Sequence, residues 1–364
     1  MAEIQGRCAD QFGSVREALA ASLDAEDVGA SVAVYVDGEP VVDLWGGYAD
    51  AARTRPWERD TIVNVWSTTK TMTALCALIL ADRGQLDVDA PVARYWPEFA
   101  AAGKADVRVR HLLSHTAGLP AWDKPMTVED LYDWDLATGR LAAQAPAWEA
   151  GTAAGYHAIT QGFLVGEVIR RVSGQDPGAF FAAEVAAPLG ADFHIGTPAE
   201  LDHRIAPVIP PPSAPDRPEG NPPVPAGTAN TTAWRRAEIP AAGGHGNARS
   251  AAAVQAVLAC GGTVGDVRLL SPAGCERALA EQYRGTDQIL GMPIRWGLGY
   301  ALDTGWLPNP RTCFWGGWGG SLVLADLDAR MTVAYVMNQM LDGGTTGDSR
   351  GFSIVTAAYE GILA

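Results

Sequence analysis

Lysine is the charged residue that this acidic chain uses least. Of its 27 basic residues, 24 are arginine and 3 are lysine, whereas aspartate and glutamate together number 42. The net charge of −15 and the absence of any Lys/Arg run leave no basic surface for nucleic acid or for an anionic membrane. We therefore expect neither as a partner. Because lysine is so scarce, the sequence around each lysine can indicate a function for it.

Cysteine and long apolar runs are scarce as well. The five cysteines form no C-x-x-C pair and no Cys/His cluster, which excludes the usual zinc and redox motifs. No stretch of membrane-spanning length is free of charged and turn residues. The segment "MAEIQGRCADQFG" lacks the basic and apolar parts of a secretory signal. These absences predict reduced thiols, no metal or other cofactor, and a cytoplasmic protein.

Strand-like segments occur near both ends of the chain. The segment "ASVAVYVDGEPVVDLWGGYAD" predicts two strands joined by a turn at Asp37-Gly38, and "CFWGGWGGSLVLADLDARMTVAYVMNQM" predicts two more. Residues 12–25 and the last segment, "FSIVTAAYEGILA", have helical patterns. The middle of the chain is helical instead, in "TALCALILADRG", "DLYDWDLATGRLAAQ" and "AITQGFLVGEVIRRVSG".

This order of segments predicts an α/β (α+β) fold. We expect an antiparallel sheet built from both chain ends and flanked by helices, with a mostly helical domain inserted. The sheet domain would comprise residues 1–75 and 250–364, and the helical domain residues 76–249, with the active site in the cleft between them. Residues 206–227 contain too much proline for a helix and predict an extended loop. We favour a surface excursion for this loop over a lid or a substrate wall.

One lysine lies in an apolar helix, in "VNVWSTTKTMTALCALILADRG". Ser67 stands at the start of that helix, where serine is a good N-cap, and Lys70 follows one turn later on the same face. Burial lowers the pKa of a lysine, and a neutral amine can activate a serine as a nucleophile. The backbone N–H groups at the helix start could stabilise an oxyanion. Alternatively, Ser67 only caps the helix and Lys70 extends to the surface.

Several further stretches occur with this S-x-x-K in a fixed order. They are "HLLSHTAGLPAW", "WEAGTAAGYHAITQGFLVGEVI", "AAGGHGNARSAAAVQAVLACGG", "VRLLSP", "WGLGY" and "FWGGWGGS". Over residues 15–362 the chain resembles the serine β-lactamase-like superfamily. That superfamily includes the class C β-lactamases, the D,D-peptidases and the family VIII carboxylesterases. The resemblance implies a β-lactamase/transpeptidase-like fold.

The resemblance also implies roles for individual residues. Ser67 would be the nucleophile and Lys70 its activating partner, while Tyr156 would share the proton transfers. Trp315-Gly316-Gly317 matches the third motif, on the strand that edges the site. The backbone N–H groups of Ser67 and Trp318 would form the oxyanion hole.

Two departures from the superfamily pattern bear on the substrate. Tyr156-His157-Ala158 lacks the asparagine of the second motif, and Trp315 replaces the cation and hydroxyl that bind a substrate carboxylate in the third motif. Trp315, Gly316, Gly317 and His157 are therefore predicted substrate contacts in an apolar site, as in the family VIII esterases. Other tryptophans are candidates for an apolar acyl pocket: Trp66, Trp122, Trp234, Trp296 and Trp318.

Two other patterns in the sequence are alternatives to this site. "GDSRG" fits the G-x-S-x-G nucleophile elbow, but no tight strand-to-turn connection precedes Ser349 and no histidine follows it. His111 and His115 have a metal-binding spacing without the accompanying glutamate, so a structural role is favoured. His157 and His245 follow family motif positions and could line the cleft.

The sequence thus predicts a serine carboxylesterase without metal or cofactor. It would cleave small to medium uncharged carboxylic esters through an acyl-enzyme on Ser67. An amidase, peptidase or acyltransferase on the same site stays open, as does a weak β-lactamase side activity. A catalytically inactive binding or scaffold homologue is the non-enzyme alternative.

Overall fold

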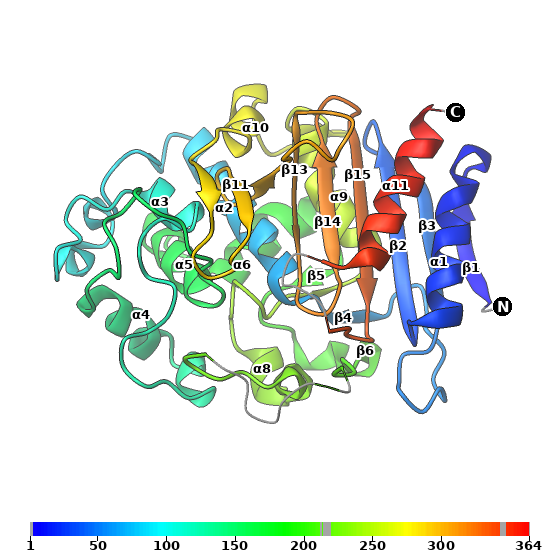
Figure 1. Ribbon diagram of the computed structural model, residues 1–364, viewed down its shortest axis with the longest axis horizontal. Coiled ribbons are helices and arrows are strands. Elements are labelled where there is room, and N and C mark those ends of the chain that lie inside the picture. The colour runs from blue at the N-terminus through cyan, green and yellow to red at the C-terminus, as the bar shows by residue number, and fades with distance from the viewer. Residues whose placement is uncertain (1–2, 212, 214–219, 343–346, 364) are drawn as a thin grey trace.

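A nine-stranded antiparallel sheet forms the centre of the protein (Figure 1). The computed structural model describes residues 3–211, 213, 220–342 and 347–363. The sheet order is β1-β3-β2-β15-β14-β13-β12-β11-β10, and every neighbouring pair is antiparallel. The strands are β1 Ile4–Cys8, β2 Gly29–Val36, β3 Glu39–Gly47, β10 Tyr283–Thr286, β11 Pro293–Trp296, β12 Ala301–Leu302, β13 Thr312–Gly316, β14 Leu322–Asp326 and β15 Met331–Met337. The expectation that both chain ends build one antiparallel sheet is confirmed.

The hairpin between β2 and β3 shows why the sequence predicts its turn. Asp37 and Gly38 have φ angles of 52° and 82°, in the left-handed region that a two-residue hairpin turn requires. The final strand region contains one strand more than expected. Its two apolar runs become β14 and β15, and "CFWGG" forms most of β13, which pairs with β14 from Thr312↔Asp326 to Gly316↔Leu322.

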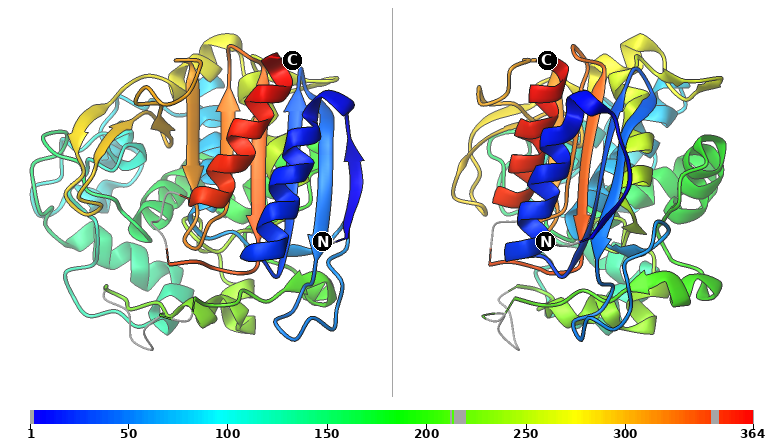
Figure 2. Two further views of the ribbon diagram at one scale, coloured as in Figure 1. Left: turned by 45° about the vertical axis from the view of Figure 1, so that its right-hand side comes forward. Right: turned by 90° about the vertical axis from the view of Figure 1, so that its right-hand side faces the viewer.

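Helices cover both faces of the sheet. The helices α1 Gly13–Ala25 and α11 Ser349–Leu363 pack side by side on one face, and α9 Ala248–Ala259 packs against β2, β14 and β15 on the other (Figure 2). The predicted first and last helices are therefore confirmed. All five cysteines are free thiols. No helix in the described part of the chain is both long and apolar enough to cross a membrane.

The middle of the chain is mostly helical. Its helices are α2 Thr69–Asp82, α3 Val109–Leu113, α4 Trp134–Ala143, α5 Thr160–Ser173, α6 Pro177–Phe181, α7 Ala187–Leu189 and α8 Thr232–Arg236, followed later by α10 Pro272–Ala278. Short strands join them: β4 Ile62–Asn64, β5 Phe193–His194, β6 Ile205–Ala206 and β7 His245–Gly246 in one small sheet, and β8 Thr263–Val264 with β9 Val267–Arg268 in another. The residue boundaries of a separate helical domain stay a prediction.

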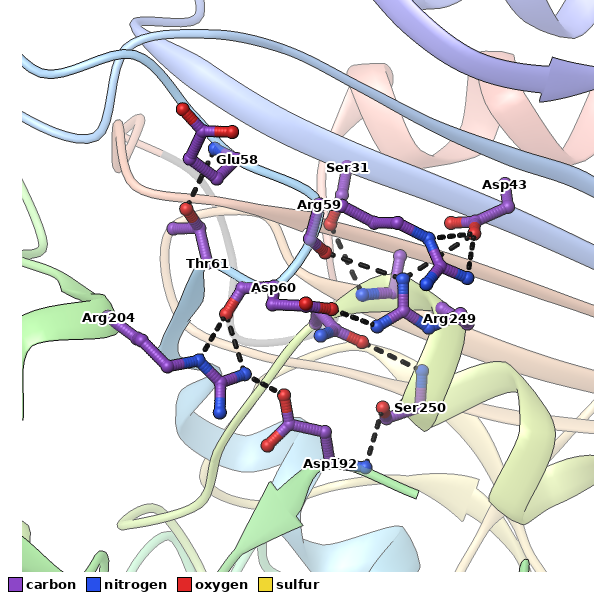
Figure 3. Close-up of polar contacts among 12 residues, drawn as sticks. Ser31, Asp43, Glu58, Arg59, Asp60, Thr61, Asp192, Arg204, Arg249 and Ser250 are labelled. Atoms are coloured by element: carbon purple, nitrogen blue, oxygen red, sulfur yellow. Dashed lines mark hydrogen bonds and ion pairs between the residues drawn. The ribbon is translucent and has the colours of Figure 1, made fainter. Parts of the chain in front are cut away.

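An ion-pair cluster holds the segment that leads into β4 (Figure 3). Arg249 on α9 pairs with Asp60 over 2.7 Å, and Arg59 pairs with Asp43 on β3 over 3.2 Å. The Arg204 side chain donates to the Asp60 backbone carbonyl. These contacts fix residues 59 and 60 to both the large sheet and its helical cover. Since β4 follows directly, they help to set where the chain enters α2.

Candidate active site

Ser67 lies in a strained turn just before α2. The chain leaves β4, passes through a 3₁₀ turn at Trp66–Thr68 and enters α2 at Thr69. Trp66 has a φ of 47°, a left-handed conformation that is unfavourable for a bulky residue and is found at functional sites. Ser67 thus lies before the helix, and its side chain makes no capping hydrogen bond. The alternative of Ser67 as a helix cap is wrong.

Lys70 points back at Ser67 from the first turn of α2. Its Nζ lies 3.1 Å from Ser67 Oγ, and it donates to the backbone carbonyls of Ala158 over 2.7 Å and Ala241 over 3.0 Å. Lys70 is 1% exposed, so it does not extend to the surface. Burial holds the pKa of this amine well below its usual value, because the ammonium form has lost its hydration.

Tyr156 completes the cluster from a distant part of the chain. It is buried, and Lys70 Nζ lies 4.8 Å from the centre of its ring. Burial raises the pKa of the Tyr156 phenol, and hydrogen bonding to the Ser67 and Trp315 side chains opposes that shift only in part. Burial therefore favours the neutral form of both proton-carrying groups beside Ser67.

Gly317 of the third motif packs closely against the backbone beside Ser67. A Cβ on Gly317 would lie 2.2 Å from the Val65 carbonyl oxygen, so only glycine allows this approach. Ser321, at the end of the same turn, donates to the Val65 carbonyl over 2.8 Å and lies 3.0 Å from Thr68 Oγ1. The turn that carries Trp318 is thereby fixed against the residues on either side of Ser67.

A cavity of about 440 Å³ opens onto Ser67. Among the described residues that line it, the polar side chains are those of Ser67, Tyr156, Thr160 and Asn221 besides the tryptophan indoles, and none is Lys, Arg, His, Asp or Glu. These described lining residues are Trp66, Ser67, Pro120, Ala121, Trp122, Tyr156, Ala158, Ile159, Thr160, Gly220, Asn221, Pro222, Val224, Ala242, Ile289 and Trp318. Such a surface suits an uncharged ligand, because a charged one would lose its hydration without compensation.

Four predicted substrate contacts do not line this cavity: Trp315, Gly316, Gly317 and His157. His157 is fully buried, with Nε2 accepting from the Leu119 N–H over 3.0 Å and Nδ1 bonded to the Gly155 carbonyl. Burial lowers its pKa to about 4, so the ring is neutral and both nitrogens are used. The structure thus places His157 in the scaffold behind Tyr156. His245, also fully buried, likewise stays away from the cavity.

Of the candidate tryptophans, Trp66, Trp122 and Trp318 line the cavity, whereas Trp234 and Trp296 pack in the interior. The rings of Trp66 and Trp318 meet edge to face with centroids 5.0 Å apart. These indoles give the cavity rigid, apolar walls next to Ser67.

The proline-rich loop has a different role from the one we favoured. Gly220, Asn221, Pro222 and Val224 form part of the cavity wall, so its description as a surface excursion is wrong for this segment. The Asn221 amide donates to the Trp122 and Lys124 carbonyls over 2.7 Å each, and its oxygen accepts from the Met126 N–H over 2.7 Å. Residue 212 and residues 214–219 of the loop lie outside the described part of the chain.

The remaining sequence candidates do not line the cavity at Ser67. Ser349 is the exposed first residue of α11 and does not line the cavity. His111 accepts from the Arg108 N–H over 3.1 Å, whereas His115 packs on Tyr156 and Trp296. Within the residues that the structure describes, no group of three or more His, Cys, Asp or Glu could hold a metal ion.

The sheet with its inserted helical region and the serine–lysine–tyrosine cluster define the class: a β-lactamase/transpeptidase-like protein. The chain belongs to the Beta-lactamase family, which it matches over residues 16–351. Esterase/beta-lactamase LipL of Mycobacterium tuberculosis is 36% identical, over 89% of this chain and 80% of that protein. Esterase EstB of Burkholderia gladioli is 30% identical, over 87% of each. The crystal structure of a family VIII carboxylesterase superposes with a TM-score of 0.94 at 46% identity, covering 99% of this chain and 100% of that one.

Proposed function

We propose that this protein is a carboxylesterase that hydrolyses small to medium uncharged esters through an acyl-enzyme on Ser67. The observation that carries the proposal is a buried amine 3.1 Å from a serine hydroxyl, at a cavity whose described lining residues carry no charge. The esterase names of the two relatives, and the family VIII carboxylesterase with the same fold, support an ester as the substrate.

Acylation begins with the neutral Lys70 amine. A neutral amine has two N–H donors and one lone pair. The carbonyls of Ala158 and Ala241 take the two donors, which leaves the lone pair for the Ser67 O–H. Lys70 accepts that proton as Ser67 Oγ attacks the ester carbonyl carbon. The backbone N–H groups of Ser67 and Trp318 stabilise the oxyanion that forms.

Tyr156 protonates the leaving group. As the tetrahedral intermediate collapses, the C–O bond to the alcohol breaks and the phenol donates its proton to the departing oxygen. The proton held by Lys70 then restores the phenol, so both groups return to their neutral forms. Water attacks the acyl-serine by the reverse proton path and releases the acid.

The cavity favours an ester over a β-lactam. A β-lactam antibiotic carries a carboxylate, and none of the cavity-lining residues that the structure describes is a cation that would compensate its lost hydration. The name of LipL nevertheless includes β-lactamase, so a weak activity of that kind is the second candidate.

A matched pair of substrates tests the proposal. We expect 4-nitrophenyl butyrate to be hydrolysed with kcat/KM at least about 100-fold above that of 4-nitrobutyranilide. Comparable rates would favour an amidase, and transfer to an added alcohol in preference to water would favour an acyltransferase.

A phosphonate probe identifies the nucleophile. We expect one adduct on Ser67 by mass spectrometry, and a loss of kcat of about 10⁴-fold or more in Ser67→Ala. Ser349→Ala is the control and should retain full activity. The absence of an adduct on Ser67 would indicate a binding or scaffold protein instead.

A further inference from the structure

Asp287 is a buried carboxylate in the turn between β10 and β11. It is 0% exposed, and among the described residues no arginine or lysine pairs with it. Its Oδ1 accepts from the backbone N–H groups of Tyr156, Ile289 and Leu290 over 2.9, 3.0 and 3.0 Å. The Trp296 indole N–H donates to Oδ2 over 3.3 Å. Four N–H donors thus replace the water that this charge has lost.

Two of these donors belong to parts of the active site. Tyr156 supplies the phenol beside Ser67, and Ile289, which is 54% exposed, lines the cavity. The Gln288 N–H also donates to the Ala154 carbonyl over 2.8 Å. Two consecutive residues of this turn, 287 and 288, therefore bond to the segment that contains Tyr156. A single carboxylate therefore joins the catalytic tyrosine to one edge of the cavity.

The tyrosine segment depends on such contacts because it has no regular structure of its own. Residues 153–157 belong to neither a helix nor a strand. The Gly155 N–H donates to the His115 carbonyl over 3.0 Å, and the His157 N–H donates to His115 Nδ1 over 3.0 Å. The bond from the Tyr156 N–H lies between these two and is the one that ends on a charged group, which makes it the stronger kind.

We propose that Asp287 is a positioning residue that holds the Tyr156 backbone in register with Ile289, so that the phenol stays directed at Ser67. This inference rests on the proposed esterase function. It assigns Asp287 no contact with the substrate. Loss of the carboxylate should therefore act through Tyr156 and reduce turnover more than substrate binding.

The chain offers a matched control for the loss of a buried carboxylate. Asp303 is 4% exposed and accepts from the N–H groups of Gly305, Trp306 and Leu307 in another turn of the same sheet region. No described contact joins Asp303 to Ser67, Lys70 or Tyr156. Replacing Asp303 should lower the stability of the protein as replacing Asp287 does, but it should leave the segment around Tyr156 unchanged.

The test compares Asp287→Asn with Asp303→Asn in the full-length protein, with 4-nitrophenyl butyrate as substrate. We expect Asp287→Asn to lower kcat by about tenfold or more with KM changed less than about threefold, whereas Asp303→Asn keeps kcat within about twofold. In a Tyr156→Phe background, Asp287→Asn should add less than about a twofold further loss, because the two residues act as a unit. A folded Asp287→Asn protein with unchanged kcat would overturn the proposal. So would an Asp287→Asn change that lowers kcat as much in the Tyr156→Phe background as it does in the wild type.

A second measurement needs no variant. In amide hydrogen exchange followed by mass spectrometry, the peptide that contains Tyr156 and the peptide that contains Ile289 should exchange at similar rates, because one carboxylate holds both backbone N–H groups. Exchange around Ile289 that is at least about tenfold faster than at Tyr156 would contradict the proposal. This measurement decides even if Asp287→Asn does not fold. It is also independent of turnover, so a wild-type protein that neither hydrolyses 4-nitrophenyl butyrate nor reacts with the phosphonate probe would count against the esterase function alone.

Discussion

The indole N–H of Trp315 donates a hydrogen bond to the phenol oxygen of Tyr156 over 3.2 Å. Both side chains are buried, and the Tyr156 ring packs against the rings of Trp315, Trp296 and His115 with centroids 5.1, 6.2 and 5.0 Å away. Trp315, the first residue of the third motif, therefore packs behind the tyrosine and is not among the residues that line the cavity.

Trp315→Phe tests that relationship. The change removes the hydrogen bond while keeping an aromatic ring, so we expect kcat to fall by about three- to tenfold, which corresponds to one ordinary hydrogen bond. KM should change by less than about twofold because Trp315 does not line the cavity. Steady-state kinetics with Trp306→Phe, an exposed tryptophan, provides the control. A raised KM at unchanged kcat would indicate direct contact with the substrate.

The pH dependence of kcat/KM should report the two neutral groups beside Ser67. Burial lowers the pKa of Lys70, so the amine becomes protonated, and activity is lost, only as the pH falls below that lowered value. Burial raises the pKa of Tyr156, so the phenol keeps its proton and activity stays level through about pH 9. A profile measured between about pH 4 and pH 10 checks both limbs. Activity that appears only near the ordinary lysine pKa would contradict a neutral amine.

Gly317→Ala should disrupt the approach of the Trp318 turn to Ser67. The added Cβ would lie 2.2 Å from the Val65 carbonyl oxygen and 2.3 Å from Ser321 Oγ, so the turn must move. We expect kcat to fall by about 100-fold or more, the scale of losing one oxyanion donor. Gly139→Ala on α4 is the control, because its Cβ meets nothing within 4 Å and alanine favours a helix. Full activity in a folded Gly317→Ala protein would exclude this turn from the oxyanion hole.

Asn221→Asp should loosen the cavity wall. An aspartate of the same shape cannot donate to the Trp122 and Lys124 carbonyls, and its charge would repel both. We expect KM to rise by about fivefold or more for 4-nitrophenyl octanoate and less for the acetate, because a longer chain contacts more of the wall. Asn230→Asp is the control: its amide bonds the Val208 backbone in the same two-way manner, away from the cavity. Equal changes for both esters would contradict this role of the wall.

The sequence reveals Ser67 and Lys70 because their relationship is local. Three residues along one apolar helix bring two side chains to one face, and an apolar helix surface predicts the burial that lowers the pKa of the amine. The fold followed in the same way from alternating strands at both ends of the chain. Tyr156 has no such local signal, since it occupies an irregular loop far away in sequence, and only the resemblance to a known superfamily pointed to it.

Where the structure differs from simple expectation, the difference concerns side-chain direction in irregular segments. In the loop around His157, neighbouring side chains point to different places, so a position next to Tyr156 does not by itself place a side chain in the cavity. In the proline-rich loop, composition excludes a helix but says nothing about which surface the chain follows. The docking of Asn221 depends on three backbone groups from another loop, and no local pattern encodes that match.

The distribution of lysines has a practical consequence for handling this protein. Lys70 is enclosed beside Ser67, and Lys104 is 0% exposed with its amine bonded to the carbonyls of Ala101, Ala142 and Gln144. Lys124 is the one lysine that is exposed, and its own carbonyl accepts from Asn221 at the cavity wall. Attachment of the native enzyme to a resin or a dye through lysine side chains would therefore occur at a single residue, whose backbone contacts the cavity wall, and a spacer arm would limit disturbance of that wall.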